Sequence, residues 1–135
     1  MMLVIGPAFS GKRAWVREAL GWSKDELAKR AACDVQDLAQ GAPDSQALEQ
    51  LAEKLAECEV VIACELGGGV VPIEPELRAW REAAGRLSCL LARRADVVVR
   101  ICCGLPQVLK GFLHTFYIAC VIIYYRDHRF LQICE

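Results

Sequence analysis

The stretch MMLVIGPAFSGKRAWVREAL, residues 1–20, decides the fold because three local signals follow one another in it. Residues 2–5 are a continuous apolar run of strand length. A glycine-bounded turn, GPAFSG, follows, and the run KRAWVREAL then carries apolar residues at helical spacing. Gly21 is placed to end that helix. A strand, a glycine turn and a helix in this order predict the opening of an α/β domain.

The turn has the spacing of a phosphate-binding P-loop in every position but the last. Gly6 and Gly11 permit backbone angles that turn successive N–H groups inward, and the helix adds its positive end. Lys12 can then reach the β and γ phosphates of a nucleotide. The sequence therefore predicts a nucleotide-phosphate site made of Gly6, Ser10, Gly11, Lys12 and Arg13.

Arg13 is the departure from the P-loop pattern, since the usual residue is a Ser or Thr whose hydroxyl helps to hold Mg²⁺. Three interpretations are open. The metal contact could come from Ser10, an acidic residue or water; Arg13 could contact a phosphate directly as a permanent cation; or Arg13 could point into solvent.

The rest of the chain continues the alternation of helices and strands. Ser23 and Glu26 form a capping box for one helix. Apolar runs of strand length are Val60–Cys64 and residues 97–103, and helical patterns cover residues 24–32, 47–58 and 74–95. Residues 1–110 are thus predicted to form a P-loop NTPase-like three-layer α/β sandwich with a small, mainly parallel sheet.

Glu65 ends the second apolar run, where open α/β sheets place ligands. We expect Glu65 to be catalytic or to support Mg²⁺, with a surface carboxylate as the alternative. The glycines at 67–69 allow close approach of the backbone to a substrate. Arg78, Arg81 and Arg86 are interpreted as surface residues of the long helix, with Arg78 spaced to pair with Glu74 or Glu82. Trp80 is expected in the core.

Residues 111–135 differ in character, being rich in aromatic and β-branched residues. Their apolar part is shorter than the roughly 20 residues of a membrane-spanning helix, so we expect no membrane span. Three interpretations of this tail are open: an extra strand, a hydrophobic flap, or the product of a shifted reading frame.

Composition narrows the class of protein. The chain has 135 residues, of which 55% are hydrophobic, and a net charge of −1, which gives no indication of nucleic-acid binding. Its eight cysteines contain no C-x-x-C pair, and there are two histidines, so zinc spacing is absent. With no secretory signal apparent, these features predict a reducing, cytoplasmic location.

Two parts of the chain resemble the bifunctional adenosylcobinamide kinase/adenosylcobinamide-phosphate guanylyltransferase family. The first is the loop GPAFSGKR. The second is the stretch ELGGGVVPIEPELRAWREAAGRLSCLLARRADVVVRICCGLPQVLK, with its acid, its glycine turn ending in Val-Pro, its Gly-Arg pair and its Ala-Asp-x-Val. The likeness covers residues 2–20 and 60–110.

The resemblance implies a cytosolic enzyme of cobalamin biosynthesis that phosphorylates the aminopropanol hydroxyl of adenosylcobinamide with ATP or GTP and Mg²⁺. It implies nucleotide contacts at the P-loop residues, Glu65 at the active site, and a homo-oligomer, trimeric in the family. It also implies a nucleophilic histidine for guanylyl transfer, but residues 21–63, where the family has it, contain none. The kinase step is therefore favoured, with a catalytically inactive nucleotide-binding or regulatory remnant as the alternative.

Overall fold

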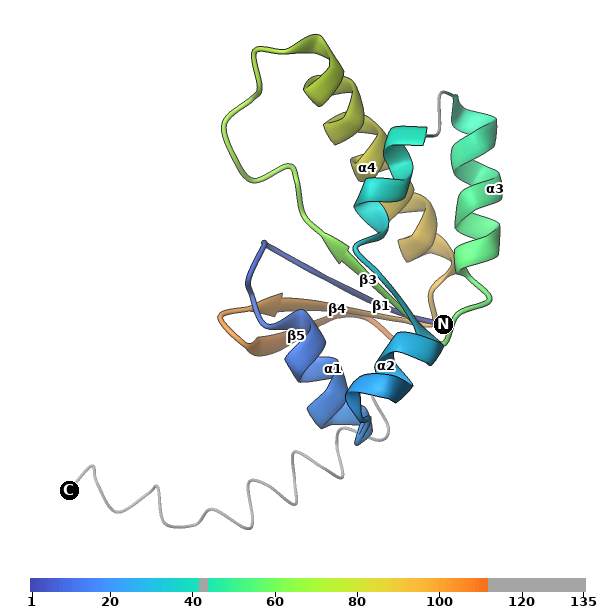
Figure 1. The fold of residues 1–135 in the computed structure, drawn as a ribbon, viewed down its shortest axis with the longest axis vertical. Helices are drawn as coiled ribbons and strands as arrows, with labels where there is room; N and C mark the ends of the chain where they lie inside the picture. Colours follow the sequence, from blue (N-terminus) through green and yellow to red (C-terminus); the bar gives the residue numbers. More distant parts are fainter. Residues whose placement is uncertain (42–43, 112–135) are drawn as a thin grey trace, which may run out of the picture.

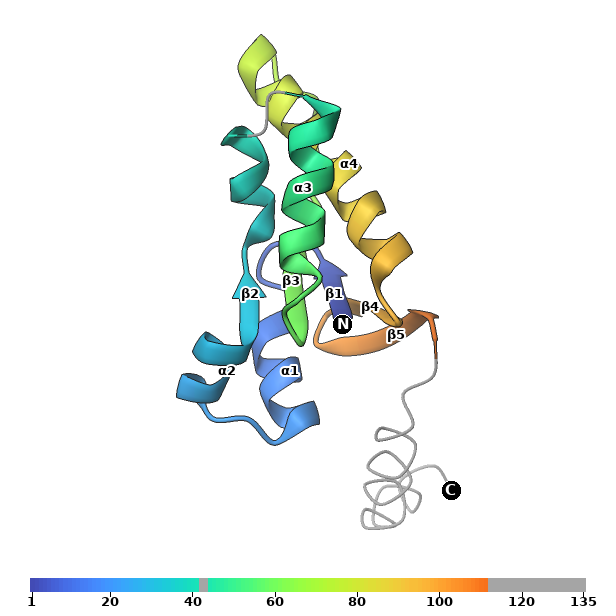
Figure 2. The ribbon, with the colours of Figure 1, turned by 90° about the vertical axis from the view of Figure 1, so that its right-hand side faces the viewer.

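The computed structural model describes residues 1–41 and 44–111 and shows a five-stranded sheet with helices on both faces (Figures 1 and 2). The strands are β1 (Met2–Gly6), β2 (Ala31–Cys33), β3 (Val60–Cys64), β4 (Val97–Cys102) and β5 (Leu105–Lys110). The helices are α1 (Lys12–Leu20), α2 (Lys24–Arg30), α3 (Ser45–Leu55) and α4 (Pro75–Arg94), with a 3-10 helix, η1 (Val35–Gly41). The mixed α/β class is as predicted.

The sheet order is β2-β3-β1-β4-β5, which places β1 in the middle. Strand β1 is parallel to both neighbours: Met2 pairs with Val60 of β3 and with Val97 of β4. Strand β2 is also parallel to β3, whereas β5 returns antiparallel to β4. The prediction of a mainly parallel sheet is confirmed, and the glycine loop leaves from its central strand.

Side chains alternate between two cores along the strands, as in a sheet that is covered on both faces. On one face, Leu3 and Val61 pack with α3 and α4, where Leu48 and Leu91 are buried. On the other face, the buried residues belong to the β strands and to the α1–α2 side. These are Val4, Trp15, Val16, Trp22, Leu27, Val60, Ile62, Val99 and Ile101. The three layers expected from the sequence are therefore present.

Strand β2 was not predicted, because the helical pattern starting at Ser23 was extended to Ala32. The capping box at Ser23 is present, but α2 ends at Arg30 and the backbone of Ala31 is extended. Ala31 pairs with Val60 and Cys33 with Ile62. Alanine is the best helix former, but helix propensity is a weak preference for any residue, and pairing with a buried neighbouring strand overrides it here.

Strand β5 was not predicted either, and all six of its residues are exposed, so it lacks the buried face that makes a strand visible in a sequence. Leu77, in the first turn of α4, is 40% exposed because the first turns of this helix extend beyond the sheet (Figure 1). The prediction for the tail falls on residues outside the described ranges, apart from Gly111.

Two further findings concern the described residues alone. Within residues 1–41 and 44–111, no helix is long and apolar enough to cross a membrane. The cysteines in these ranges are all free: Cys33, Cys58, Cys64, Cys89, Cys102 and Cys103.

Candidate phosphate-binding site

The glycine loop between β1 and α1 is built on backbone that only glycine adopts freely. Gly6 has φ 155° and Gly11 has φ 88°. A Cβ on Gly6 would lie 2.4 Å from the carbonyl oxygen of Ile101 on β4. Glycine at position 6 therefore lets the central strand run close against its neighbour before the chain turns into the loop.

Backbone hydrogen bonds hold the loop from both sides. The N–H of Glu65, just after β3, donates to the carbonyl of Gly6 at 3.0 Å. The N–H of Gly104, in the turn after β4, donates to the carbonyl of Ser10 at 3.0 Å. The ends of both parallel neighbours of β1 thus fix the position of the loop.

Lys12 is buried, with 6% of its surface exposed, although it carries a charge. Its Nζ donates to the carbonyl of Gly6 at 3.0 Å and to that of Pro7 at 2.6 Å. An ammonium group has three N–H donors, so these two bonds leave one for a further acceptor. The predicted lysine therefore lies inside the loop, with its charge held against the loop's own carbonyls.

Ser10 supplies a second polar group to the loop. Its Oγ is buried and has no hydrogen-bond partner among the described residues. Buried hydroxyls without a partner are uncommon in folded proteins. This hydroxyl is therefore available to an acceptor or donor that enters the loop.

Arg13 forms an ion pair with Asp34, a residue that the sequence did not single out. Asp34 follows β2 directly and has φ 55°, a left-handed conformation that Asp tolerates better than most residues. The Arg13 side chain is 56% exposed and pairs with a carboxylate at the loop, so the three interpretations of Arg13 stay open.

Glu65 forms the second ion pair beside the loop, with Arg100 of β4. Arg100 Nε donates to Oε1 and the Arg100 terminal nitrogen to Oε2, both at 2.9 Å. These hydrogen bonds raise the pKa of Arg100 above its already high ordinary value, so the guanidinium stays charged. The Glu65 carboxylate is part-buried and lies where the sequence predicted it, at the end of β3.

The residues around the loop do not fit a magnesium ion held directly by the protein. Position 13 carries a guanidinium where the P-loop pattern has a hydroxyl, and the carboxylates of Asp34 and Glu65 are each paired with an arginine. Within the described ranges, no group of three or more His, Cys, Asp or Glu residues is placed to hold a metal ion.

A cavity of about 460 Å³ opens over the loop. Lys12, Arg13 and Asp34 line it together with Ile62 and Cys64 of β3. It therefore has cations at its base, on the α1 side, and the carboxyl ends of two parallel strands beside them. This is the position at which open α/β sheets bind ligands.

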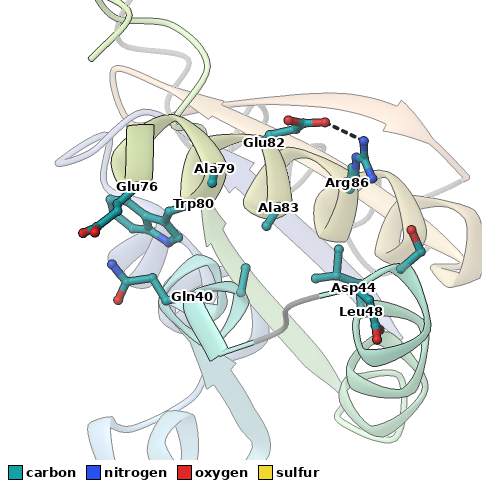
Figure 3. Close-up of a pocket in the computed structure, with 11 residues that line it drawn as sticks. Gln40, Asp44, Leu48, Glu76, Ala79, Trp80, Glu82, Ala83 and Arg86 are labelled. Carbon is teal, nitrogen blue, oxygen red and sulfur yellow. Dashed lines mark hydrogen bonds and ion pairs between the residues drawn. The ribbon is translucent and has the colours of Figure 1, made fainter. Parts of the chain in front are cut away.

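A larger cavity of about 830 Å³ lies elsewhere, between α4 and the segment formed by η1 and the start of α3 (Figure 3). Trp80 lines it and donates from its indole N–H to the carbonyl of Gln36 at 2.8 Å. Trp80 is therefore only partly in the core. The two cavities share no residue, and the smaller one contains the loop.

The arginines of α4 lie away from the loop cavity. Arg86 pairs with Glu82, as expected for a surface ion pair (Figure 3). Arg78 was expected to pair with Glu74 or Glu82, but it donates to the carbonyl of Pro72 at 3.1 Å instead. Arg81 donates to the carbonyls of Val70 and Gly69, both at 3.0 Å, and so shapes the glycine turn.

Asp34 and Arg100 are the two residues beside the loop that sequence reasoning missed. A charged residue inside the apolar run VVVRICC was a signal for Arg100, since an isolated charge in a buried strand needs a partner. Asp34 gave no signal, because β2 itself was read as helix.

The geometry defines a class first: an α/β protein with a glycine loop between its central strand and the following helix, and a lysine inside that loop. Comparison with protein-family models then gives the particular family, since residues 21–109 match cobinamide kinase / cobinamide phosphate guanyltransferase. That range covers well over half of the 135 residues, and the chain belongs to this family. A search of curated proteins finds no match.

The family match confirms the resemblance read from the sequence, and it begins after the loop, at Gly21. Membership supports a role in cobalamin biosynthesis as a nucleotide-related transferase. The phosphate-binding role of the loop stays a prediction, which rests on the spacing of its residues and on the geometry described above.

Proposed function

We propose that the chain is a nucleotide-dependent kinase that phosphorylates the aminopropanol hydroxyl of adenosylcobinamide, using ATP or GTP. The observation that carries the proposal is Lys12, a buried cation held inside a glycine loop at the end of the central strand. Family membership supplies the corrinoid acceptor.

In the proposed reaction, the acceptor oxygen forms a bond to the γ-phosphorus while the bond from that phosphorus to the β–γ bridging oxygen breaks. The nucleoside diphosphate leaves, and the hydroxyl proton passes to solvent. Lys12 and the loop glycines Gly6 and Gly11 bind the phosphates, and Arg13 adds a second cation. The proposed reaction uses no metal ion that is bound directly by side chains of the protein.

Glu65 is proposed to orient the acceptor hydroxyl. A carboxylate has about four lone-pair sites, and the two hydrogen bonds from Arg100 leave room for a further donor. Arg100 would then act as a positioning residue that fixes the plane of this carboxylate.

Guanylyl transfer is left out of the proposal on chemical grounds. A covalent nucleotidyl intermediate needs a nucleophilic side chain such as an imidazole, and residues 1–113 contain no histidine. His114 and His128 lie outside the described residues. A cytoplasmic location and a homo-oligomer remain part of the proposal.

Calorimetry with ATP and with GTP tests the first half of the proposal. Lys12→Met retains the aliphatic stem but removes the charge, so binding should fall by about tenfold or more, given roughly 1.5–3 kcal/mol for a charged hydrogen bond. Lys29→Met removes an exposed lysine of α2 and serves as the matched control. A kinase assay with adenosylcobinamide then tests phosphoryl transfer.

A second candidate is a nucleotide-binding member without transfer activity. It is favoured by the two carboxylates next to the loop, Asp34 and Glu65, which are both neutralised by arginines. Nucleotide binding that depends on Lys12, combined with no phosphorylated product, would support this candidate over the kinase. Absence of binding in a folded sample would refute both.

A further inference from the structure

We propose that Arg13 binds the nucleotide phosphates in place of a metal ion held by the protein, and that Asp34 is the internal competitor that occupies Arg13 until a nucleotide arrives. This inference rests on the proposed function, since it concerns the same loop. The ligand of the site is then the nucleotide without bound magnesium, and Asp34 sets the affinity of the site for that nucleotide.

The position of Arg13 supports a phosphate contact. Arg13 is the second residue of α1, directly after the buried Lys12, and it lines the same cavity as Ser10 and Lys12. Its side chain is 56% exposed, so it can change partner without any repacking of the core. A guanidinium offers five N–H donors in a planar fork that matches two phosphate oxygens.

Asp34 is held where it can compete for that guanidinium. It is the first residue after β2, and its left-handed backbone places its carboxylate on Arg13 at the cavity wall. The carboxylate is itself 41% exposed, so the ion pair lies in contact with water. Exposed ion pairs of this kind contribute little, and a multiply charged phosphate chain presents a stronger field than one carboxylate.

The same geometry explains why a metal ion is not required at this position. The serine or threonine of the usual pattern contributes to the site through magnesium, which neutralises phosphate charge. Here the neutralising charge is already part of the chain at position 13. The charge of the other nearby carboxylate, Glu65, is already balanced by Arg100, which donates to both of its oxygens.

Calorimetric titration of the full chain with ATP tests the inference, in buffer with magnesium and in buffer with EDTA. For the wild type, the two dissociation constants should agree within about threefold. Arg13→Ser restores the usual residue: it should bind ATP about tenfold or more weakly in EDTA, and regain affinity when magnesium is added. Asp34→Asn should bind ATP about two- to fivefold more tightly than the wild type at low salt, because the competitor is removed.

The controls separate this effect from a general change of surface charge. Asparagine tolerates the left-handed backbone at position 34 as well as aspartate does. Glu59→Gln breaks a similar exposed pair, in which Arg30 donates to both Glu59 oxygens at 2.7 and 2.6 Å. Arg30 and Glu59 do not line the loop cavity, so Glu59→Gln should leave ATP affinity unchanged.

Each outcome decides the inference. Wild-type binding that weakens tenfold or more in EDTA would overturn it while leaving the proposed function standing. Unchanged or weaker ATP binding in Asp34→Asn would overturn the role of Asp34 as competitor. Loss of binding in every variant and in the wild type, with thermal unfolding showing folded samples, would refute the proposed function itself.

Discussion

Replacing Gly6 by alanine should destabilise the whole domain, because the added Cβ would meet backbone that has no room to move. That Cβ would lie 2.4 Å from the carbonyl oxygen of Ile101, well inside the closest approach of real Cβ atoms. Ile101 is fully buried in β4, next to the central strand. In addition, φ at position 6 is 155°, in a region that residues with a side chain rarely adopt.

The magnitude follows from these two effects. A strained backbone conformation costs about 1–3 kcal/mol, and forcing extra atoms into a packed interior costs a further 1–3 kcal/mol. The free energy of unfolding should therefore fall by about 2–6 kcal/mol. With an m-value of about 2 kcal/mol per molar urea, the midpoint of equilibrium unfolding should fall by about 1–3 M.

Gly85→Ala is the matched control. Gly85 lies inside α4, and nothing is within 4 Å of the position its Cβ would occupy. Alanine should raise the free energy of unfolding there by about 0.5–1 kcal/mol, since glycine is a poor helix former. If Gly6→Ala unfolded within about 0.5 kcal/mol of the wild type, the account of the close approach between β1 and β4 would be refuted.

Two further predictions concern titratable groups. The pKa of Glu26 is lowered because its carboxylate accepts a hydrogen bond from the backbone N–H of Ser23. The contribution of Glu26 to the free energy of unfolding is therefore present above the ordinary pKa of 4.5, and it is lost as pH falls through the lower pKa of the folded state. Glu26→Gln should therefore show a smaller fall in urea midpoint between pH 6 and pH 3 than the wild type, and an equal fall would contradict this. Burial raises the pKa of the Cys33 thiol, an effect that the nearby Arg13 guanidinium opposes only in part. At pH 8, mass spectrometry should find Cys33 alkylated by iodoacetamide more slowly than the exposed Cys89, and equal rates would show that Cys33 is not shielded.

The centre of the fold could be predicted from the sequence because its signals are strong and local. Strands β1, β3 and β4 are apolar runs that are buried on both faces, and the capping box at Ser23 specifies where α2 begins. The edges could not be predicted for the opposite reason. β2 has three residues and β5 has no buried face, so both are set by pairing with a neighbour rather than by their own pattern.

The same distinction applies to the candidate site. The loop residues were found because glycine and lysine at fixed spacing carry their own chemistry. Asp34 and Arg100 were missed because the role of each depends on an ion-pair partner far along the chain. Asp34 pairs with Arg13, 21 residues away, and Arg100 pairs with Glu65, 35 residues away. No pattern within a short window contains both members of either pair.

The anchoring of the loop has a consequence for hydrogen exchange. The amides of Glu65 and Gly104 donate to the first and penultimate residues of the glycine loop, Gly6 and Ser10, from the two strands that flank β1. For the loop to open, these bonds must break next to the most buried part of the sheet, so opening is tied to the unfolding of its centre. Both amides should therefore exchange with solvent deuterium far more slowly than their place in turns suggests, and their exchange rates report directly on how rigid the loop is before any ligand enters.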